Sequence, residues 1–150
     1  MIPSVLSREQ AQLEVEENLR LLTATVRARM REAAKSVDPA LSLFGLKVLQ
    51  LLKRTGPAHS GAVADLLFVD KSVISRQSRQ LLDLGLIEVQ SDPADGRARL
   101  LVLTPAADKR VSAIQTGIML DPDVLRSWSA EDLHRFAGYL SRLAGGHPVA

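Results

Sequence analysis

Serine and arginine side chains line one side of a short helix predicted at residues 71–84. Asp70 is well placed to be its N-cap, and Gly85 follows its last residue. At about 100° per residue, the apolar residues Ile74 and Leu81 share one side of this helix. The opposite side is polar: Ser72, Arg76, Arg79 and Asp83, flanked by Ser75 and Gln80. Hydroxyls near a helix N-terminus can approach phosphates in a DNA major groove, and arginine can bond guanine O6 and N7 together.

A second group of candidate contacts lies on a predicted β-hairpin. Residues 86–90 and 99–103 are rich in β-forming side chains, and turn-forming residues fill 91–98 between them. Arg97 falls at the protruding tip of this hairpin, next to Arg99. The negative potential of a DNA minor groove favours an inserted guanidinium. The sequence therefore predicts a minor-groove contact made by Arg97.

Further helices are predicted around these two elements from apolar side chains at three- and four-residue spacing. They cover residues 7–35, 42–54, 61–67 and 105–120, and a last stretch that begins with a capping box at Ser129 and ends at Gly145. At about 1.5 Å per residue the first helix would be about 40 Å long and would project beyond a small globule. The order of two short helices followed by a hairpin is that of a winged helix-turn-helix. The predicted fold class is therefore mainly α with a small β-hairpin (α+β).

Composition excludes several classes of protein. The 150 residues suffice for one domain, and the net charge of +2 is only a weak hint of nucleic-acid binding. The absence of cysteine excludes disulfides, thiolate metal sites and thiol-based redox sensing. The three histidines have no metal-ligand spacing, so no metal or cofactor is expected. With no apolar run of about 20 residues and no secretory signal, the expected location is the cytoplasm, without a membrane partner.

Two segments resemble the MarR family of bacterial-type winged-helix transcription factors. Residues 70–77 (Asp-Lys-Ser-Val-Ile-Ser-Arg-Gln), with Leu-Ile after Gly85, are similar to the recognition helix of that family. Residues 92–97 (Asp-Pro-Ala-Asp-Gly-Arg), with Leu-Thr-Pro at 103–105, are similar to its wing and to the start of its fifth helix. The Asp-x-Arg triplet with the downstream Leu-Thr is the most specific part, and the resemblance extends over nearly the whole chain.

The resemblance implies a domain organisation and a partner. Residues 1–150 would form a single MarR-like domain, with a helical dimerisation region at 1–37 and 105–146 and a DNA-binding lobe at 40–104. Two copies would form a two-fold homodimer through the first, fifth and sixth helices and bind a pseudo-palindromic operator, more commonly as a repressor. A projecting first helix and an apolar stripe on the last helix also need a partner to cover them.

The resemblance also assigns roles to polar residues. Arg97 would be the minor-groove arginine of the wing, and Asp95 would orient a nearby arginine and shape the tip. The other expected DNA contacts are Lys71 on a phosphate, Ser72, Ser75, Arg76 and Arg79 in the major groove, and Arg99 on the wing. Gln77 is of a type that can read adenine, but its angle on the helix turns it towards the core.

A small-molecule effector is a further expectation from the resemblance. Regulators of this type commonly release DNA when an aromatic or lipophilic anion enters a cleft between the dimerisation helices and the DNA-binding lobe. Residues expected near this cleft are Val26, Met30, Phe44, Val48, Ile114 and Ile118. Core packing explains each of these apolar residues equally well, and only 3% of the chain is aromatic.

Two other classes of function compete with this interpretation. An enzyme is disfavoured, because the sequence lacks a glycine-rich phosphate loop, a nucleophile elbow and paired histidines at metal spacing. A winged helix that binds protein instead of DNA stays open, because residues 70–100 contain five basic and five acidic residues. The wing and the recognition helix distinguish the two binding functions. If retention of DNA requires Arg97 and the face that carries Ser72 and Arg76, a winged helix that binds only protein is excluded.

Overall fold

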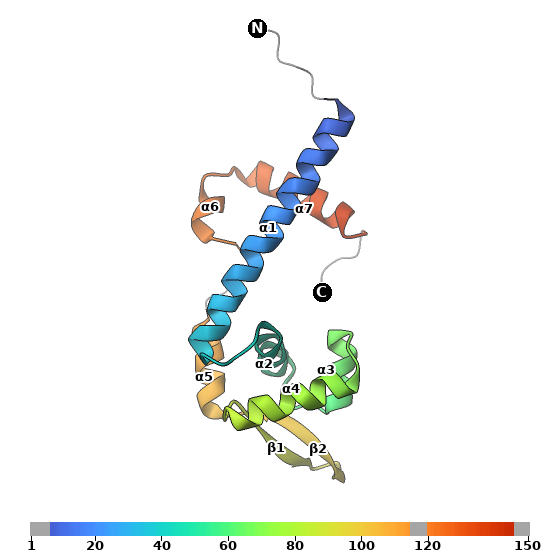
Figure 1. Cartoon of the computed structure of the whole chain (residues 1–150), viewed down its shortest axis with the longest axis vertical. Helices are drawn as coiled ribbons and strands as arrows, with labels where there is room; N and C mark the ends of the chain where they lie inside the picture. Colours follow the sequence, from blue (N-terminus) through green and yellow to red (C-terminus); the bar gives the residue numbers. More distant parts are fainter. Residues whose placement is uncertain (1–6, 115–119, 146–150) are drawn as a thin grey trace. The chain divides into compact units, whose positions relative to one another are not determined.

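The computed structural model describes residues 7–114 and 120–145. The chain forms two compact units, residues 1–118 and 119–150. The helices and strands of the first unit are α1 (Arg8–Val37), α2 (Leu43–Thr55), α3 (Ser60–Leu67), α4 (Lys71–Asp83), β1 (Ile87–Asp92), β2 (Asp95–Leu103) and α5 (Pro105–Ala113) (Figure 1). Those of the second unit are α6 (Pro122–Arg126) and α7 (Ala130–Leu143). The chain is therefore mainly α-helical with one antiparallel hairpin, as the sequence predicts.

The bounds of α1 to α4 agree with the predicted helices to within two residues, but three predictions need correction. Helix α5 ends at Ala113, because Ile114 is extended, with ψ of 117°, and residues 115–119 of the helix predicted to residue 120 lie outside the described residues. Pro122 does not simply stop a helix: it is the first residue of α6, which the sequence analysis did not predict. The strands also continue into the expected turn, so that only two residues separate β1 from β2.

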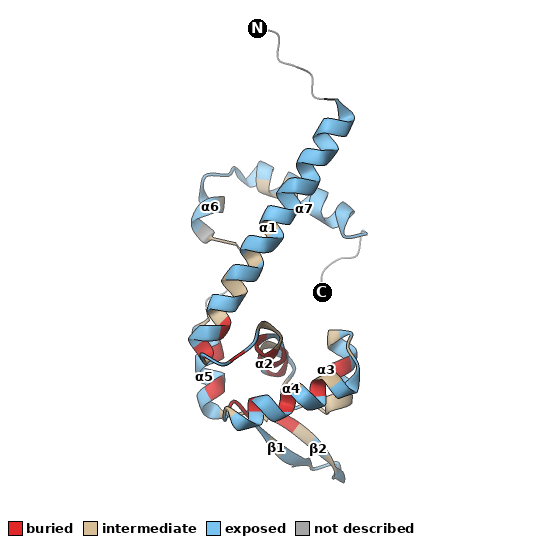
Figure 2. Ribbon diagram, viewed as in Figure 1, coloured by how far each residue is buried: buried red, intermediate tan, exposed pale blue. Residues whose placement is uncertain are grey.

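Helix α1 begins at a capping box and is exposed over most of its length. The Ser7 hydroxyl accepts a hydrogen bond from the Gln10 amide at 3.2 Å, and the Gln10 side chain accepts one from the Ser7 amide at 2.9 Å. Of the residues of α1, Ala34 and Val37 near its C-terminal end are buried (Figure 2). Towards its N-terminus, apolar side chains such as Leu13, which is 64% exposed, face solvent.

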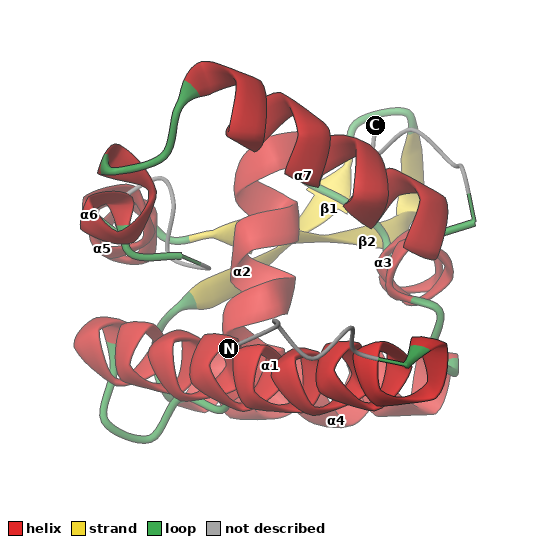
Figure 3. Cartoon of the chain, turned by 90° about the horizontal axis from the view of Figure 1, so that it is seen from above, coloured by secondary structure: helices red, strands yellow, loops and turns green. Residues whose placement is uncertain are grey.

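Helix α2 lies at the centre of the first unit and contacts α1, α5 and β2 (Figure 3). Its side chains Leu46, Val48 and Leu49 are fully buried. The other elements of the unit contribute Val63, Ile74, Leu81, Leu86, Ile87, Leu101, Ala107 and Val111 to the same core. Burial of a leucine contributes about 1.5–3 kcal/mol, so this single cluster provides most of the driving force that positions α3, α4 and the hairpin.

The hairpin is joined to the rest of the unit at both ends. Its strands pair from Ile87 opposite Leu103 to Asp92 opposite Asp95. Ala58, just before α3, exchanges two backbone hydrogen bonds with Leu101, at 3.2 and 2.8 Å. Thr104 caps α5 by accepting from the Ala107 amide at 3.2 Å, and its hydroxyl donates to the Gly85 carbonyl at 2.9 Å. These bonds hold the base of the hairpin next to the end of α4.

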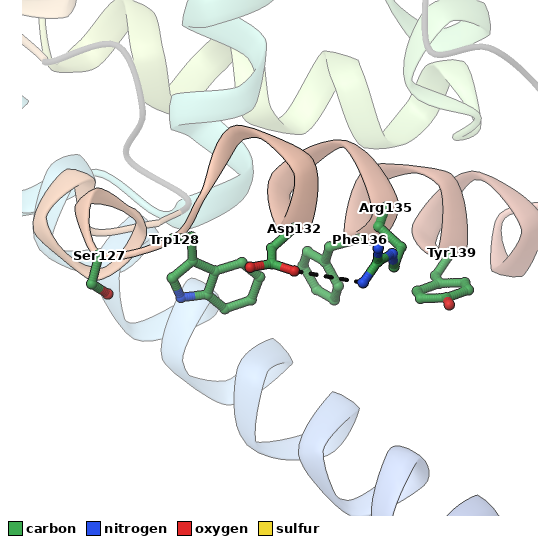
Figure 4. A pocket seen from close by; sticks show the side chains of 6 residues that line it. All are labelled: Ser127, Trp128, Asp132, Arg135, Phe136 and Tyr139. Atoms are coloured by element: carbon green, nitrogen blue, oxygen red, sulfur yellow. Dashed lines mark ion pairs between the residues drawn. The ribbon is translucent and has the colours of Figure 1, made fainter.

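The second unit is a short helix followed by a strongly amphipathic one. Ser129 caps α7 by accepting from the Asp132 amide at 3.0 Å, as its capping-box pattern predicts. The Trp128 and Phe136 rings meet edge to face with centroids 5.3 Å apart. They line a surface pocket together with Ser127, Asp132, Arg135 and Tyr139 (Figure 4). No described side chain of α7 is buried, so its apolar stripe is uncovered in one chain.

Within the described ranges, no helix is long and apolar enough to cross a membrane, and no group of three or more His, Asp or Glu side chains could hold a metal ion.

The turn between α3 and α4 contains a strained residue. Phe68 has φ of 56° and ψ of 43°, in the left-handed region, and its side chain is 95% exposed. This conformation ends α3, because it lets the Val69 amide bond the Ala64 carbonyl at 3.0 Å. A side chain at this backbone position costs about 1–2 kcal/mol relative to the right-handed region, and glycine avoids that cost.

We expect Phe68→Gly to raise the free energy of unfolding by about 1 kcal/mol, because it removes the backbone strain and loses almost no buried surface. Urea denaturation followed by circular dichroism measures the change. Phe68→Ala is the matched control, since it removes the same ring but keeps the strained backbone. A glycine variant no more stable than the alanine variant would contradict the expectation.

Candidate nucleic-acid interface

Helix α4 divides into a buried and an exposed face. Ile74 and Leu81 are fully buried against the core, and Ser78 between them is also buried. The five polar residues predicted to contact DNA on this helix are all exposed: Lys71, Ser72, Ser75, Arg76 and Arg79. Core burial of one face therefore fixes which side chains of α4 face solvent.

The charged side chains of the exposed face of α4 are free to bind a ligand. Within the described part of the chain, Lys71, Arg76 and Arg79 form no ion pair and no side-chain hydrogen bond. Asp70 occupies the N-cap position, as predicted, but its side chain accepts no capping hydrogen bond. Amide groups at the start of α4 thus lack a side-chain acceptor, and the dipole of a helix N-terminus favours an anion such as a DNA phosphate.

Gln77 contacts helix α2 rather than the solvent side of α4. Its carbonyl oxygen accepts from the Ser42 hydroxyl at 3.4 Å, and its amide nitrogen donates to Gln80 at 3.1 Å. Gly45 of α2 allows this approach, because a Cβ there would lie 3.0 Å from the Gln77 amide nitrogen and 2.6 Å from Cδ1 of Leu41. Gln77 therefore packs α4 onto α2, in agreement with the angle that turns it towards the core.

Two aspartates shape the tip of the hairpin. The Asp92 carboxylate accepts from the Ala94 amide at 2.8 Å, and the Asp95 carboxylate accepts from the Arg97 amide at 3.1 Å. Asp95 thus contacts the backbone of Arg97, and no arginine side chain bonds it among the described residues. It shapes the tip without pairing to a guanidinium.

Arg97 and Arg99 are both exposed and point to the same side of β2, since they are two residues apart on a strand. Their guanidinium groups have no partner in the described ranges. The structure therefore presents two unpaired arginines on the hairpin and two on α4, Arg76 and Arg79, within one unit. Guanidinium groups can donate hydrogen bonds to phosphates and to base edges in adjacent DNA grooves.

The sequence analysis missed one residue next to this surface, His59. It is the N-cap residue of α3, but it makes no side-chain capping bond. Its Nδ1 lies 3.1 Å from the Arg99 carbonyl oxygen, and its Nε2 lies 2.9 Å from Oδ2 of Asp92. The only available signal was a histidine at a position that usually holds serine, threonine, aspartate or asparagine.

The residues expected near an effector cleft have different environments. Val48 is fully buried in the core, whereas Met30, Phe44 and Ile114 are partly buried and pack against it. Val26 is half-buried on α1. Ile118 lies outside the described residues. The partly buried members come from α1, α2 and the end of α5, which contact one another in pairs.

Comparisons with known proteins agree with this geometry. The sequence profile of the MarR family matches residues 46–98, which include α3, α4 and the tip of the hairpin. The uncharacterized HTH-type transcriptional regulator YxaD of Bacillus subtilis is 31% identical over 97 residues, which cover 64% of this chain and 68% of the relative.

Solved structures share the fold. A MarR family protein from Bacillus stearothermophilus superposes with a TM-score of 0.72 at 20% identity, over 93% of this chain and 97% of the other. A mutant of MarR from E. coli, complexed with operator DNA, gives a TM-score of 0.65 at 14% identity, over 91% and 98% of the two chains. The sequence match, the shared winged helix-turn-helix and the exposed arginines converge, and the chain belongs to the MarR family of transcriptional regulators.

Proposed function

We propose that this protein binds a pseudo-palindromic DNA operator as a homodimer and represses transcription from it. The observation that carries the proposal is that one compact unit presents both the exposed serine and arginine face of α4 and two exposed arginines of the hairpin. Its action would be binding and not catalysis, and it would take place in the cytoplasm, where the DNA is. The operator complex of the E. coli MarR mutant supports the same mode of binding for this chain.

In this proposal α4 enters the major groove and the hairpin enters the adjacent minor groove. Arg76 and Arg79 would bond base edges, and Arg97, with Arg99 beside it, would lie in the minor groove. Lys71 and the hydroxyls of Ser72 and Ser75 lie in the first turns of α4, where phosphate contacts are favourable. Asp95 contributes indirectly, through the hydrogen bond that shapes the backbone at Arg97.

We expect Arg97→Ala to weaken operator binding by about ten- to a hundredfold, because each protomer loses a groove-inserted guanidinium. The measurement is a mobility shift with DNA from just upstream of the gene, or with a site recovered by random-site selection. Arg54→Ala is the matched control. It removes the same charge from the exposed last turn of α2, outside the α4 face, the hairpin and the proposed dimer surface.

The control variant should bind the operator like the wild type. If the wild-type protein showed no specific retention on either DNA, the alternative of a protein-binding winged helix would replace the proposal. Equal losses for Arg97→Ala and Arg54→Ala would indicate general charge attraction rather than a minor-groove contact.

The homodimer is proposed from apolar surface that a single chain leaves uncovered. On α1 the exposed apolar side chains include Leu13, Leu19 and Leu21, and on α7 they include Tyr139, Leu140 and Leu143. Soluble proteins rarely expose such surface without a partner. A second copy fits best, because a two-fold dimer would also place two recognition helices on a two-fold symmetric DNA site.

We expect Leu143→Glu to convert the dimer to a monomer, because it would bury an unpaired carboxylate at the interface. Leu143 is 62% exposed in the single chain, so the protomer itself should keep its fold. Sedimentation equilibrium measures the mass of each species. Ser141→Glu introduces the same charge on an exposed position of the same helix and should leave the mass of the wild type unchanged. A monomeric wild-type protein would refute the proposal.

An effector that releases the DNA is proposed for the region between α1, α2 and α5. Met30, Phe44 and Ile114 are partly buried where these helices contact, and Val26 and Ile118 are the remaining candidates. Val48 would form the floor of such a site, since it is fully buried. A ligand there relieves repression only if it binds the released state more tightly, with a coupling of about 1–3 kcal/mol.

A reporter gene behind the operator tests repression and release separately. We expect low expression when the protein is present and recovery on addition of hydrophobic aromatic carboxylates of graded size. Phe44→Trp should fill the site, and should therefore keep repression but lose the recovery. If the ligands restored reporter expression as fully with Phe44→Trp as with the wild type, the effector would bind elsewhere. High expression with the wild-type protein and no ligand would contradict repression.

A further inference from the structure

We infer that His59 is a positioning residue for DNA binding, which holds the hairpin against the N-terminal end of α3 so that Arg97 and Arg99 face the groove. The inference rests on the proposed DNA-binding function and adds to it a residue outside the contact surface. It also explains why a helix N-cap position is occupied by a side chain that does not cap.

The imidazole ring bridges two points of the hairpin that lie on different strands. Nδ1 faces the Arg99 carbonyl oxygen of β2 at 3.1 Å, and Nε2 faces the Asp92 carboxylate at the end of β1 at 2.9 Å. A carbonyl oxygen and a carboxylate accept hydrogen bonds but donate none. An imidazolium can therefore donate to both, and a neutral imidazole can donate to one of them. Next to the ring, the backbone of Ala58 pairs with Leu101. Ala58 therefore fixes the hairpin through its backbone, and His59 fixes it through its side chain, nearer the tip.

Hydrogen bonds and the short stretch of backbone between them connect His59 to the tip. Asp92 uses one carboxylate oxygen for His59 and the other for the Ala94 amide. The chain then turns through Asp95, whose carboxylate accepts from the Arg97 amide. The carboxylate of Asp92 is well shielded, with 16% of its side chain exposed. Loss of the ring would release Asp92 and allow the tip, with Arg97, to sample other orientations.

This arrangement contributes to DNA affinity through pre-organisation. A hairpin that already has its bound orientation loses less conformational entropy on binding than a mobile one. The ring lies on the backbone side of Arg99, through its carbonyl, and leaves the guanidinium free. We therefore expect loss of His59 to lower the affinity for DNA only when the hairpin arginines are present.

His59→Ser is the informative variant, because serine can cap α3 but cannot reach the hairpin. We expect it to unfold at the same temperature as the wild type or higher, and to bind the operator roughly fivefold more weakly. A variant with both Arg97→Ala and Arg99→Ala provides the second background. There His59→Ser should cause no further loss, measured at an ionic strength low enough for the double variant still to bind.

Three results would overturn the inference. An equal loss in both backgrounds would mean that His59 itself contacts DNA, and no loss in the wild-type background would mean that the bridge has no role in binding. A lower unfolding temperature for His59→Ser would mean that the residue serves general stability.

Hydrogen exchange in the free protein separates this inference from the proposed function. The backbone amides of residues 91–99 should exchange faster in His59→Ser than in the wild type, while those of α4 stay unchanged. Faster exchange at the hairpin with no operator binding by the wild type would contradict the DNA function but support the bridge. Unchanged exchange at the hairpin would contradict the bridge, even for a protein that binds DNA.

Discussion

The burial of α2 is the constraint on which the first unit depends. This helix has apolar side chains around most of its circumference, and Leu46, Val48 and Leu49 are completely buried. Each neighbouring element is amphipathic and covers part of it, so the apolar faces of α3, α4 and α5 are turned inwards together. Gly45 permits α2 and α4 to approach closely at Gln77. The polar face of α4 is consequently directed outwards, and its position is fixed by the burial of Ile74 and Leu81.

The hairpin has a different physical basis, because few of its residues are buried. Leu101 and Ile87 anchor it to the core, but beyond them the strands rely on main-chain and side-chain hydrogen bonds. Asp92, Asp95 and His59 supply these bonds near the tip. Hydrogen bonds at a partly exposed site stabilise less than apolar burial, so the orientation of the tip depends on a few individual bonds. The two sides of the proposed interface thus differ in what holds them in place: apolar burial for α4 and hydrogen bonds for the tip of the hairpin.

In the described single chain, two helices leave apolar surface uncovered. Helices α1 and α7 present leucine and tyrosine side chains to solvent, although both helices have good caps and regular spacing. The apolar residues of α1 near Val37 are buried by the first unit, whereas those near Leu13 are not. The proposed function therefore rests on two surfaces of the same chain: a polar one on α4 and the hairpin, and an apolar one on the terminal helices.

The order of the elements other than α6, the inner and outer faces of α4 and the place of Arg97 followed from the sequence, because periodicity, caps and turn residues are local signals. The start of α7 at its capping box was equally local. The bridge from His59 to the Arg99 carbonyl joins residues 40 positions apart, and no local pattern encodes such a contact. The same reason applies to the Ser42 contact that turns Gln77 inwards, where only helix periodicity gave a partial indication. The sequence by itself determined which polar residues lie on the outer face of α4 and on the hairpin, and the tertiary structure decided which of them are held in place, because packing and long-range hydrogen bonds exist only in the folded chain.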